Sequence, residues 1–255
     1  MTEVLQTALD GRVLRVALNR PEKRNALNLE LCRELVAALD RADSDPKAGA
    51  VLLSGNGKAF CAGMDLNEVL SAPQGPLGKV HEQLFIAGAR MTKPVVAAVQ
   101  GPALAGGTGL VANAHIVVAS EDATFGLTEI RIGLWPFLIF RGIRAALGER
   151  RALELSLTGR VFGAQEALQF GLVHHVVPGA ELDARAFEIA STLAAASPMA
   201  LRSGLMFVQQ TRGKSWTDAG EIARQIRDQV FQGEDFQEGI RAFREKRQPH
   251  WPSIV

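Results

Sequence analysis

The sequence predicts an α/β fold, in which a parallel sheet is covered by helices on both faces. Three short apolar runs have the length and composition of buried strands: residues 50–54, 94–99 and 116–119. Helical periodicity lies between them, and strands buried on both faces form nearly continuous apolar runs. From about Arg150 the periodicity is mostly helical. We therefore expect an α/β core over residues 1–196 and a helical region over residues 197–255, divided near Ser197-Pro198.

The individual elements follow from local patterns. Alternating apolar and polar residues over 12–18 predict a strand, which the turn at 19–21 ends. Asn28 is a suitable N-cap for an apolar-striped helix that reaches about Asp43. A short strand is expected at 172–177. The helical segments expected after Arg150 are 151–157, 164–170, 181–196, 200–210 and 217–232.

Composition excludes several classes of function. The 255 residues are 47% hydrophobic and carry a formal net charge of +1, so nothing global favours nucleic acid or an anionic membrane as a partner. The N-terminus lacks the pattern of a signal peptide, and no apolar run reaches membrane-spanning length. Two cysteines, Cys32 and Cys61, cannot form a zinc site alone, and the histidines lack metal-ligand spacing. We expect a cytoplasmic protein without a metal or a bound cofactor.

The glycine-rich segment after the second apolar run partly matches a dinucleotide-binding fingerprint. Gly107, Gly109 and Ala112 fit G-x-G-x-x-A, and Glu129 lies about twenty residues further on. In a true fingerprint the first glycine directly follows a strand, whereas residues 101–106 intervene in this chain. Nicotinamide or flavin binding is therefore disfavoured, and glycines that permit close helix packing are a better explanation.

Two segments of small residues predict an oxyanion hole. Residues 57–66 and 101–107 each follow a predicted buried strand, and their lack of bulky side chains lets a ligand approach the backbone. Two backbone N–H groups from separate loops can stabilise one developing negative oxygen. The second segment leads into an expected helix from about Gly107, whose dipole would add to that field.

Six segments in register resemble the enoyl-CoA hydratase/isomerase (crotonase) superfamily, from about Val4 to Trp251. They are residues 19–27, 59–66, 94–107, 125–134, 157–173 and 243–249. The resemblance implies the spiral of ββα units of the ClpP/crotonase fold and an acyl-CoA thioester as substrate. It also implies a homotrimer or hexamer, with residues 197–255 as the trimerisation region.

The resemblance also implies roles for particular residues. The backbone N–H groups of Met64 and Gly106 would hold the thioester oxygen, and Glu129 would be the catalytic acid/base. Coenzyme A would be bound by residues along the N-terminal half: Arg24, Ala26, Ala62, Asp65 and Leu66. Asp65 has a structural alternative, as the cap of a helix. Phe243 and Lys246 would reach the coenzyme A of a neighbouring subunit, with a core aromatic and a solvated lysine as alternatives.

One departure from the family pattern bears on the reaction. Hydratases of the family usually carry two glutamates, and the first would fall at Gly109, which has no side chain. One carboxylate can move a proton between two carbons, which favours 3-enoyl-CoA to 2-enoyl-CoA isomerisation. The apolar stretch 135–140 would exclude water and raise the pKa of Glu129. A solvated or salt-bridged acid beside Arg131 is the structural alternative for Glu129.

Enoyl-CoA hydration remains the alternative reaction, with another acid replacing the missing glutamate; Glu68, Glu121 and Asp122 are candidates. A catalytically silent acyl-CoA-binding subunit is a further possibility. We expect the acyl-chain preference to depend on residues 67–79 and on the apolar stretch 135–140.

Overall fold

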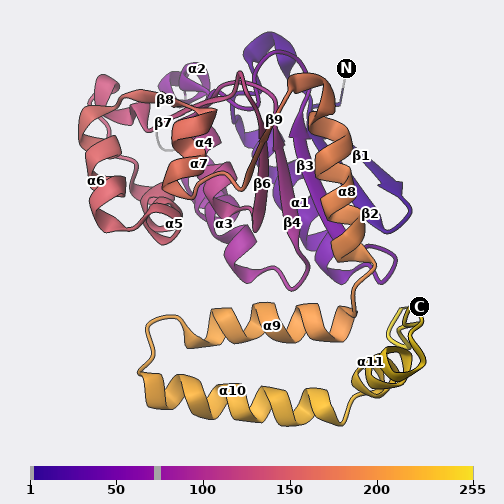
Figure 1. Cartoon of the computed structure of the whole chain (residues 1–255). Helices are drawn as coiled ribbons and strands as arrows, with labels where there is room; N and C mark the ends of the chain where they lie inside the picture. The colour runs from indigo at the N-terminus through magenta and orange to yellow at the C-terminus, as the bar shows by residue number, and fades with distance from the viewer. Residues whose placement is uncertain (1–2, 72–75, 255) are drawn as a thin grey trace.

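A parallel sheet forms the centre of the α/β part (Figure 1). The computed structural model describes residues 3–71 and 76–254. Within them a six-stranded sheet has the order β1-β2-β3-β4-β6-β9, and every neighbouring pair is parallel except β1 with β2. Its strands are β1 (Leu5–Asp10), β2 (Val13–Leu18), β3 (Ala50–Gly55), β4 (Val95–Val99), β6 (Ile116–Ser120) and β9 (His175–Val177). The predicted α/β class is confirmed.

Helices cover both faces of this sheet, because alternate strand residues point to opposite sides. Val51 and Leu53 of β3 join the larger core cluster, which contains α1 (Leu29–Ser44) and α3 (Leu77–Arg90). Ala50 and Leu52 join a second cluster with α8 (Leu182–Ala194). Asn28 caps α1 by accepting the N–H of Leu31, as its sequence context predicts.

A second, smaller sheet lies beside the carboxyl ends of these strands. Within the described residues it has the order β5-β7-β8, with β5 (Ala103–Leu104), β7 (Thr124–Gly126) and β8 (Val161–Gly163). The sequence did not predict these strands, since two or three residues carry no readable alternation. The surrounding elements are η1 (Pro21–Lys23), α2 (Leu66–Ser71), α4 (Gly106–Asn113), η2 (Thr128–Ile132), α5 (Phe137–Leu147), α6 (Glu149–Thr158), α7 (Ala164–Phe170) and η3 (Gly179–Glu181).

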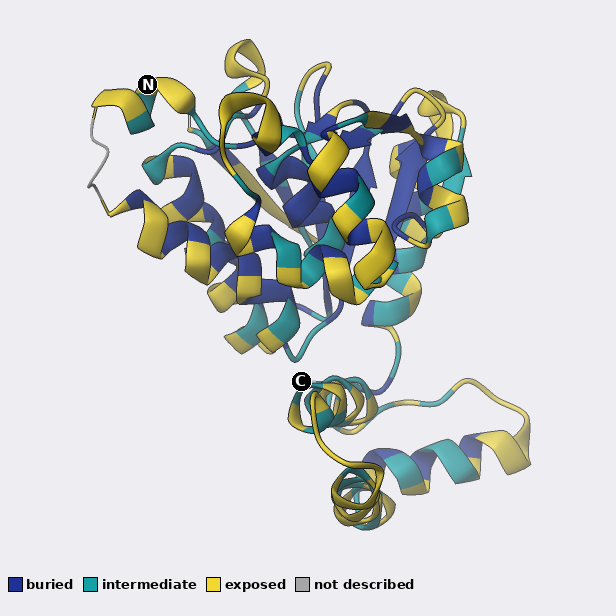
Figure 2. Ribbon diagram, turned by 90° about the vertical axis from the view of Figure 1, so that its left-hand side faces the viewer, coloured by how far each residue is buried: buried dark blue, intermediate teal, exposed yellow. Residues whose placement is uncertain are grey.

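Three helices follow the α/β part and lie below it in Figure 1: α9 (Pro198–Thr211), α10 (Trp216–Phe231) and α11 (Glu234–Glu245). Neither α9 nor α10 contains a buried residue, and exposed and half-buried residues predominate along them (Figure 2). The C-terminal segment is tied to α11 and α9 by Asp235, which accepts hydrogen bonds from the hydroxyls of Ser197 and Ser253. None of the helices described has the length and apolar character needed to cross a membrane.

Candidate active site

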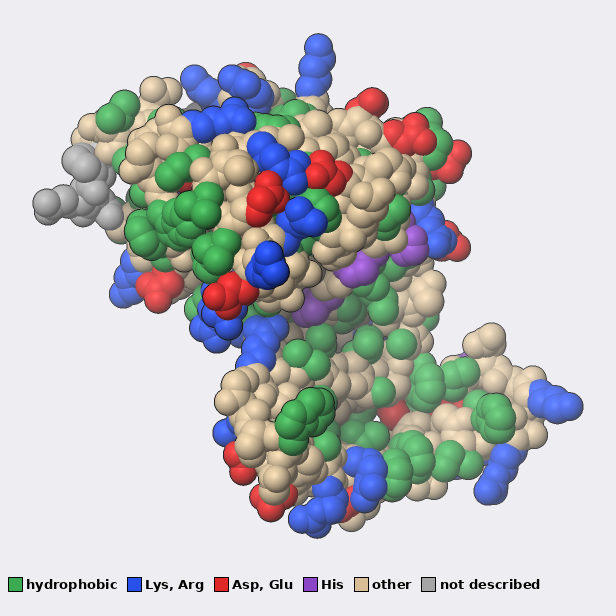
Figure 3. All heavy atoms as spheres, turned by 60° about the vertical axis from the view of Figure 1, so that its left-hand side comes forward, with side chains coloured by type: hydrophobic (Ala, Val, Ile, Leu, Met, Phe, Trp, Pro, Cys, Tyr) green, Lys and Arg blue, Asp and Glu red, His purple; other side chains and the backbone are tan. Residues whose placement is uncertain are grey.

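An apolar cavity of about 320 Å³ lies among α3, η2 and the start of α5. Its wall is made by Leu27, Ala62, Met64, Leu66, His81, Phe85, Ala105, Gly106, Thr128, Glu129, Ile132, Leu134, Trp135, Pro136, Phe137, Leu138 and Ile139. Figure 3 shows hydrophobic side chains gathered on this side of the α/β part, where Leu134, Phe137 and Leu138 are exposed. An exposed apolar rim of this kind suits an apolar ligand that enters from the surface.

Three backbone segments meet at one side of the cavity. Isolated β-bridges pair Leu27 with Met64 and Cys61 with Ala103. The segment that follows β3 therefore lies between the segment of Leu27 and the segment of Ala103. The amide of Leu27 donates to the Gly63 carbonyl at 2.7 Å, and the amide of Asp65 donates to the Leu27 carbonyl at 3.1 Å. The bridge uses the Gly63 carbonyl and the Asp65 N–H, which flank Met64. The Met64 N–H therefore takes no part in the bridge.

Close backbone approach explains the glycines of these segments. A Cβ placed on Gly63 would lie 2.9 Å from the Ala105 Cβ and 3.2 Å from the Gly106 nitrogen. Gly107 approaches Cys61 so closely that a Cβ would lie 2.1 Å from the Cys61 carbonyl oxygen. Any side chain at these positions would push the two segments apart.

The amides of Met64 and Gly106 are left without protein acceptors. Among residues 3–71 and 76–254, neither N–H donates to a backbone or side-chain group. Gly106 is the first residue of α4, where helix geometry provides no partner for its N–H. Both residues line the cavity. An oxygen placed there would receive two hydrogen bonds and the positive end of the α4 dipole.

Ala105 holds this turn in an uncommon backbone conformation, with φ 50° and ψ −119°. Residues other than glycine rarely adopt such angles, and they persist only where the surroundings fix them. The Ala105 N–H donates to the Gly126 carbonyl at 2.7 Å. The Thr108 hydroxyl lies 2.6 Å from the Ala103 carbonyl oxygen and accepts the Gly126 N–H at 3.1 Å. These bonds join the start of α4 to β7, which leads to Glu129.

Glu129 is the carboxylate of the cavity. It lies in η2, its side chain is buried (8% exposed), and its Oε2 atom has no hydrogen-bond partner among the residues described. Burial raises the pKa of Glu129 to about 7, because the charged form loses solvation. Within the described residues no ion pair joins it to Arg131, so the salt-bridged alternative is wrong.

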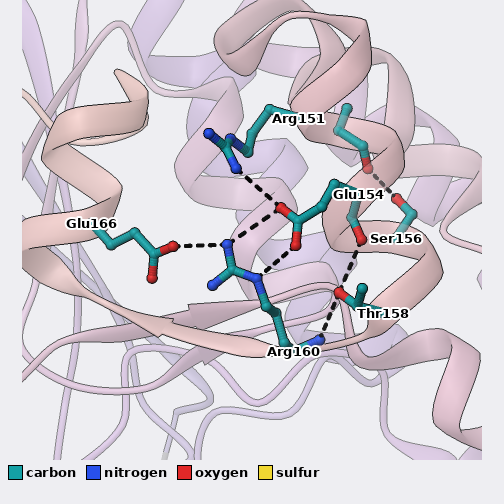
Figure 4. Close-up of polar contacts among 7 residues, drawn as sticks. Arg151, Glu154, Ser156, Thr158, Arg160 and Glu166 are labelled. Carbon is teal, nitrogen blue, oxygen red and sulfur yellow. Dashed lines mark hydrogen bonds and ion pairs between the residues drawn. The ribbon is translucent and has the colours of Figure 1, made fainter.

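A half-buried ion-pair cluster supports the chain behind Glu129 (Figure 4). Arg160 contacts Glu154 of α6 at 2.6 Å and Glu166 of α7 at 2.7 Å. Arg160 directly precedes β8, which pairs antiparallel with β7. Gly159 packs against the turn that carries Glu129, since a Cβ there would lie 2.6 Å from Ile130. The cluster thus fixes the strand pair from which the Glu129 turn extends.

The space beside Gly109 is filled by apolar side chains. A Cβ on Gly109 would lie 2.4 Å from Ile139 Cγ2 and 3.1 Å from Phe85 Cε1. A glutamate at this position would therefore collide with the buried Ile139 side chain. Of the possible substitutes, Glu68 accepts the Leu29 N–H at 2.8 Å at the start of α1. Glu121 and Asp122 are exposed at the turn after β6, and none of the three lines the cavity.

His81 is a second polar side chain of the cavity, which the sequence analysis missed. It lies on α3, is 5% exposed, and its Nε2 atom has no hydrogen-bond partner among the described residues. Burial lowers the pKa of His81, against the opposing effect of a hydrogen bond to the Leu27 backbone. Its one sequence signal is a histidine within an apolar helical stripe, which is typical of a core residue.

The chain matches the family model described as enoyl-CoA hydratase/isomerase over residues 9–253. The chain belongs to the enoyl-CoA hydratase/isomerase family. It is 39% identical over 252 residues to enoyl-CoA hydratase EchA19 of Mycobacterium tuberculosis, covering 94% of this chain and 93% of the relative. It is 37% identical over 241 residues to 2,3-dehydroadipyl-CoA hydratase of Escherichia coli, covering 93% of this chain and 94% of the relative.

Solved structures of enoyl-CoA hydratases share the fold. One from Mycobacterium smegmatis matches with a TM-score of 0.93 and 31% identity, covering 97% of this chain and 98% of that chain. One from Bacillus anthracis matches with a TM-score of 0.92 and 32% identity, covering 98% and 99%. The resemblance and the crotonase-like fold expected from the sequence are confirmed. Acyl-CoA thioesters are the substrates that membership of this family implies.

The positions expected to bind coenzyme A form two groups in this family member: one lies at or near the cavity, and the other lies at the end of α11. Ala62 and Leu66 line the cavity, and Arg24 is nearby in the chain path because the Ala62 N–H donates to the Arg24 carbonyl at 2.9 Å. Arg24 itself is exposed, and Ala26 is half-buried. Ala62 and Leu66 therefore lie at the cavity, and the segment of Arg24 and Ala26 is hydrogen-bonded beside them.

Asp65 belongs to an ion pair that the sequence analysis missed. Its carboxylate contacts Arg20 at 3.1 Å, and both side chains are only 13% exposed. The Arg20 guanidinium also donates to the Ala26 carbonyl. This pair holds the segment that carries Arg24 and Ala26 against the start of α2.

Phe243 and Lys246 are not brought to the cavity within one chain. Both are at the end of α11, outside the cavity wall, and Phe243 is 85% exposed. The core-aromatic alternative for Phe243 is therefore wrong, whereas Lys246 is exposed as a solvated lysine would be. Cys61 is buried beside the oxyanion segment, and burial raises its pKa to about 12, so the thiol is protonated at neutral pH.

Proposed function

We propose that this protein is an enoyl-CoA hydratase, which adds water across the 2,3-double bond of an enoyl-CoA thioester. The observation that carries the proposal is a buried carboxylate, Glu129, in the same apolar cavity as two backbone amides that have no acceptor in the part of the chain that the structure describes. The hydratase names of the relatives support hydration over the isomerisation that the missing glutamate favoured.

In the proposed reaction, the thioester oxygen accepts hydrogen bonds from the Met64 and Gly106 amides. Negative charge grows on this oxygen as water attacks C3, and the two donors stabilise the resulting enolate. Glu129 then gives a proton to C2, and the proton that the attacking water loses restores the Glu129 carboxyl group. A pKa of about 7 suits this role, because an appreciable fraction of the carboxyl group is protonated at neutral pH.

Coenzyme A would follow the segments of Arg24, Ala26, Ala62 and Leu66, with Arg24 contacting a phosphate. Asp65 would act indirectly, by holding Arg20 and so the segment that carries Arg24. Phe243 and Lys246 would meet the coenzyme A of a neighbouring copy. That arrangement requires a homotrimer or hexamer, formed through the helical region of residues 197–255.

Isomerisation of 3-enoyl-CoA to 2-enoyl-CoA is a second candidate function. The contact between Gly109 and Ile139 favours it, because the space of the second carboxylate is occupied by a hydrocarbon side chain. A single Glu129 carboxylate could then remove a proton from C2 and return it to C4. The acyl preference of either reaction would depend on the apolar stretch 135–140 and on residues 67–79, of which 72–75 lie outside the described residues.

Paired turnover tests these two reactions. Purified protein is assayed for hydration of 2-enoyl-CoA thioesters and for isomerisation of 3-enoyl-CoA thioesters of matched chain length, each repeated with Glu129→Gln. Dominant hydration that is lost in the variant supports the proposal. Dominant isomerisation would overturn it in favour of the second candidate. Turnover of neither substrate, with acyl-CoA binding retained, would indicate a silent acyl-CoA-binding subunit.

A further inference from the structure

Two buried polar side-chain atoms have no hydrogen-bond partner among the described residues: His81 Nε2 and Glu129 Oε2. Both residues line the same cavity, whose remaining side chains are almost all apolar. A buried polar atom without a partner destabilises the folded protein, so such atoms are rare and call for an explanation. Both belong to one apolar cavity, which indicates that the cavity's ligand supplies the missing hydrogen bonds.

The surroundings of His81 determine which kind of hydrogen bond it can offer. The imidazole lies beside the Leu27 backbone, whose effect on the pKa of His81 opposes that of burial. Burial favours the neutral ring at pH 7. A neutral imidazole has one N–H and one acceptor nitrogen. In the neutral tautomer that carries its proton on Nδ1, Nε2 is a buried acceptor that no described residue satisfies.

The position of His81 places this acceptor near the missing glutamate. Phe85 lies one helical turn further along α3, and its ring centroid is 5.8 Å from that of His81. The same Phe85 ring would lie 3.1 Å from a Cβ on Gly109 and 3.2 Å from one on Gly106. Leu27, whose backbone contacts His81, also packs against Gly106. His81 thus belongs to the side of the cavity where a glutamate at position 109 would have projected.

We infer that His81 is a catalytic residue, which holds the attacking water at Nε2 and accepts its proton in place of the absent glutamate. The inference rests on the proposed hydration. It explains how the cavity keeps two proton-transfer groups, His81 and Glu129, although Ile139 fills the space beside Gly109. It also assigns the attacking water as the hydrogen-bond partner of His81 Nε2.

The proposed step is balanced. The water oxygen forms a bond to C3, and one water proton passes to His81 Nε2. The π electrons of the double bond move between C1 and C2, and the carbonyl π pair moves onto the oxygen held by Met64 and Gly106. When the enolate collapses, the Glu129 proton passes to C2. The imidazolium proton then returns to the Glu129 carboxylate, so water is the one added reactant.

The test separates water attack from proton transfer at C2. Hydration is measured as kcat with 2-enoyl-CoA thioesters from crotonyl-CoA to dodecenoyl-CoA. Exchange of the C2 protons of the matching saturated acyl-CoA is measured in D₂O, a reaction that uses Glu129 and the two amides without attacking water. The variants are His81→Phe, which removes both nitrogens, and His81→Gln, which keeps an acceptor oxygen. Glu82→Gln, an exposed neighbour on the same helix, is the matched control.

We expect His81→Phe to lower kcat for hydration by roughly 10²–10⁴-fold and to leave C2 exchange within about threefold. His81→Gln should recover part of the hydration rate, because it can hold the water without accepting the proton. Glu82→Gln should change neither reaction. Retained exchange also shows that a variant is folded.

Two results would overturn the inference: hydration by His81→Phe within about threefold of the original protein, or equal losses of hydration and exchange in both His81 variants. The second would indicate a structural or pocket-shaping role. Failure of the proposed function is distinguishable, because the unmutated protein would then exchange C2 protons without hydrating any 2-enoyl-CoA.

Discussion

The two sides of the reaction cavity are built in different ways. On one side, Gly63, Ala105 and Gly106 bring two backbone segments so close that a Cβ on Gly63 would lie 2.9 Å from the Ala105 Cβ. On the other side, residues 135–139 offer side chains, and Phe137 is 73% exposed. The positions of backbone N–H donors are fixed by the fold. Exposed side chains can rotate, and they can be substituted without moving the backbone.

This difference predicts that the backbone side of the cavity governs the reaction rate and that the apolar side governs substrate preference. The backbone side presents N–H groups whose positions depend on the close packing of the two segments. Changes there should therefore lower the rate for every substrate. In the proposed reaction the apolar side would contact the acyl chain through dispersion and desolvation, so changes there should alter the order of preferred substrates. Substitutions on each side test this division.

The largest effect is expected for Glu129→Gln, which removes the carboxyl proton and keeps the side-chain shape. We expect kcat to fall by roughly 10³–10⁴-fold for all acyl chains, since no other carboxylate among the described residues lines the cavity. Steady-state assays across chain lengths measure the effect. A loss confined to some chain lengths would contradict the division between the two sides.

The same variant should change the pH dependence of stability. The pKa of Glu129 is raised from 4.5 to about 7 in the folded protein, so folding disfavours the charged form. The original protein should lose stability as the pH rises from about 4.5 to about 7, by roughly 3 kcal/mol at about 1.4 kcal/mol per pKa unit. Glu129→Gln should lack this decline when unfolding free energies are measured by denaturant titration at about pH 5 and about pH 8.

A smaller loss is expected when the Gly106 donor is removed. Gly106→Pro replaces the N–H at the first position of α4, where proline suits the helix, and should lower kcat/KM by roughly 10²–10³-fold. Gly106→Ala is the control, because it keeps the N–H and its Cβ would meet flexible side-chain ends at 3.2 Å. Similar losses in the two variants would mean that crowding, and not the donor, is responsible.

Restoring a second glutamate should fail. Gly109→Glu places a side chain where a Cβ would lie 2.4 Å from Ile139 Cγ2, and should lower the free energy of unfolding by about 1–3 kcal/mol without raising the hydration rate. Thermal melting and turnover assays measure both effects. A stable, faster Gly109→Glu variant would show that the cavity has room for a second carboxylate.

The smallest effect is expected on the apolar side. Phe137→Ala removes an exposed ring from the cavity rim and should leave kcat for crotonyl-CoA within about twofold, while KM for long acyl chains rises by roughly 3–10-fold. The comparison of KM across chain lengths is the measurement. An equal change for short and long chains would indicate that Phe137 contributes to chemistry and not to selectivity.

The sequence predicted the large features and missed the small ones for physical reasons. The strands β3, β4 and β6 are apolar runs of five or six residues, whereas β5 and β7 have two or three residues and are too short to show a pattern. The two small-residue segments could be recognised because close backbone approach demands small side chains, and their role as an oxyanion hole remains a prediction. The division at Ser197-Pro198 into two regions remains a prediction.

The polar groups missed by sequence analysis are defined by distant contacts. Arg20 and Asp65 form their ion pair across 45 positions of the chain, and nothing local to either residue indicates the partner. His81 occupies an apolar helical stripe, where a histidine is commonly a core residue. Only the folded chain reveals that its Nε2 atom has no partner within residues 3–71 and 76–254, and that its cavity also contains Glu129.

The contact between Gly109 and Ile139 also restricts how this chain could change over generations. A side chain cannot be accommodated at position 109 while Ile139 Cβ lies 2.8 Å from the site of the new Cβ. Position 139 would have to become smaller first, and that intermediate would carry a cavity in its core. The two positions are therefore epistatic, and the order of substitutions decides whether a route to a two-glutamate site is open.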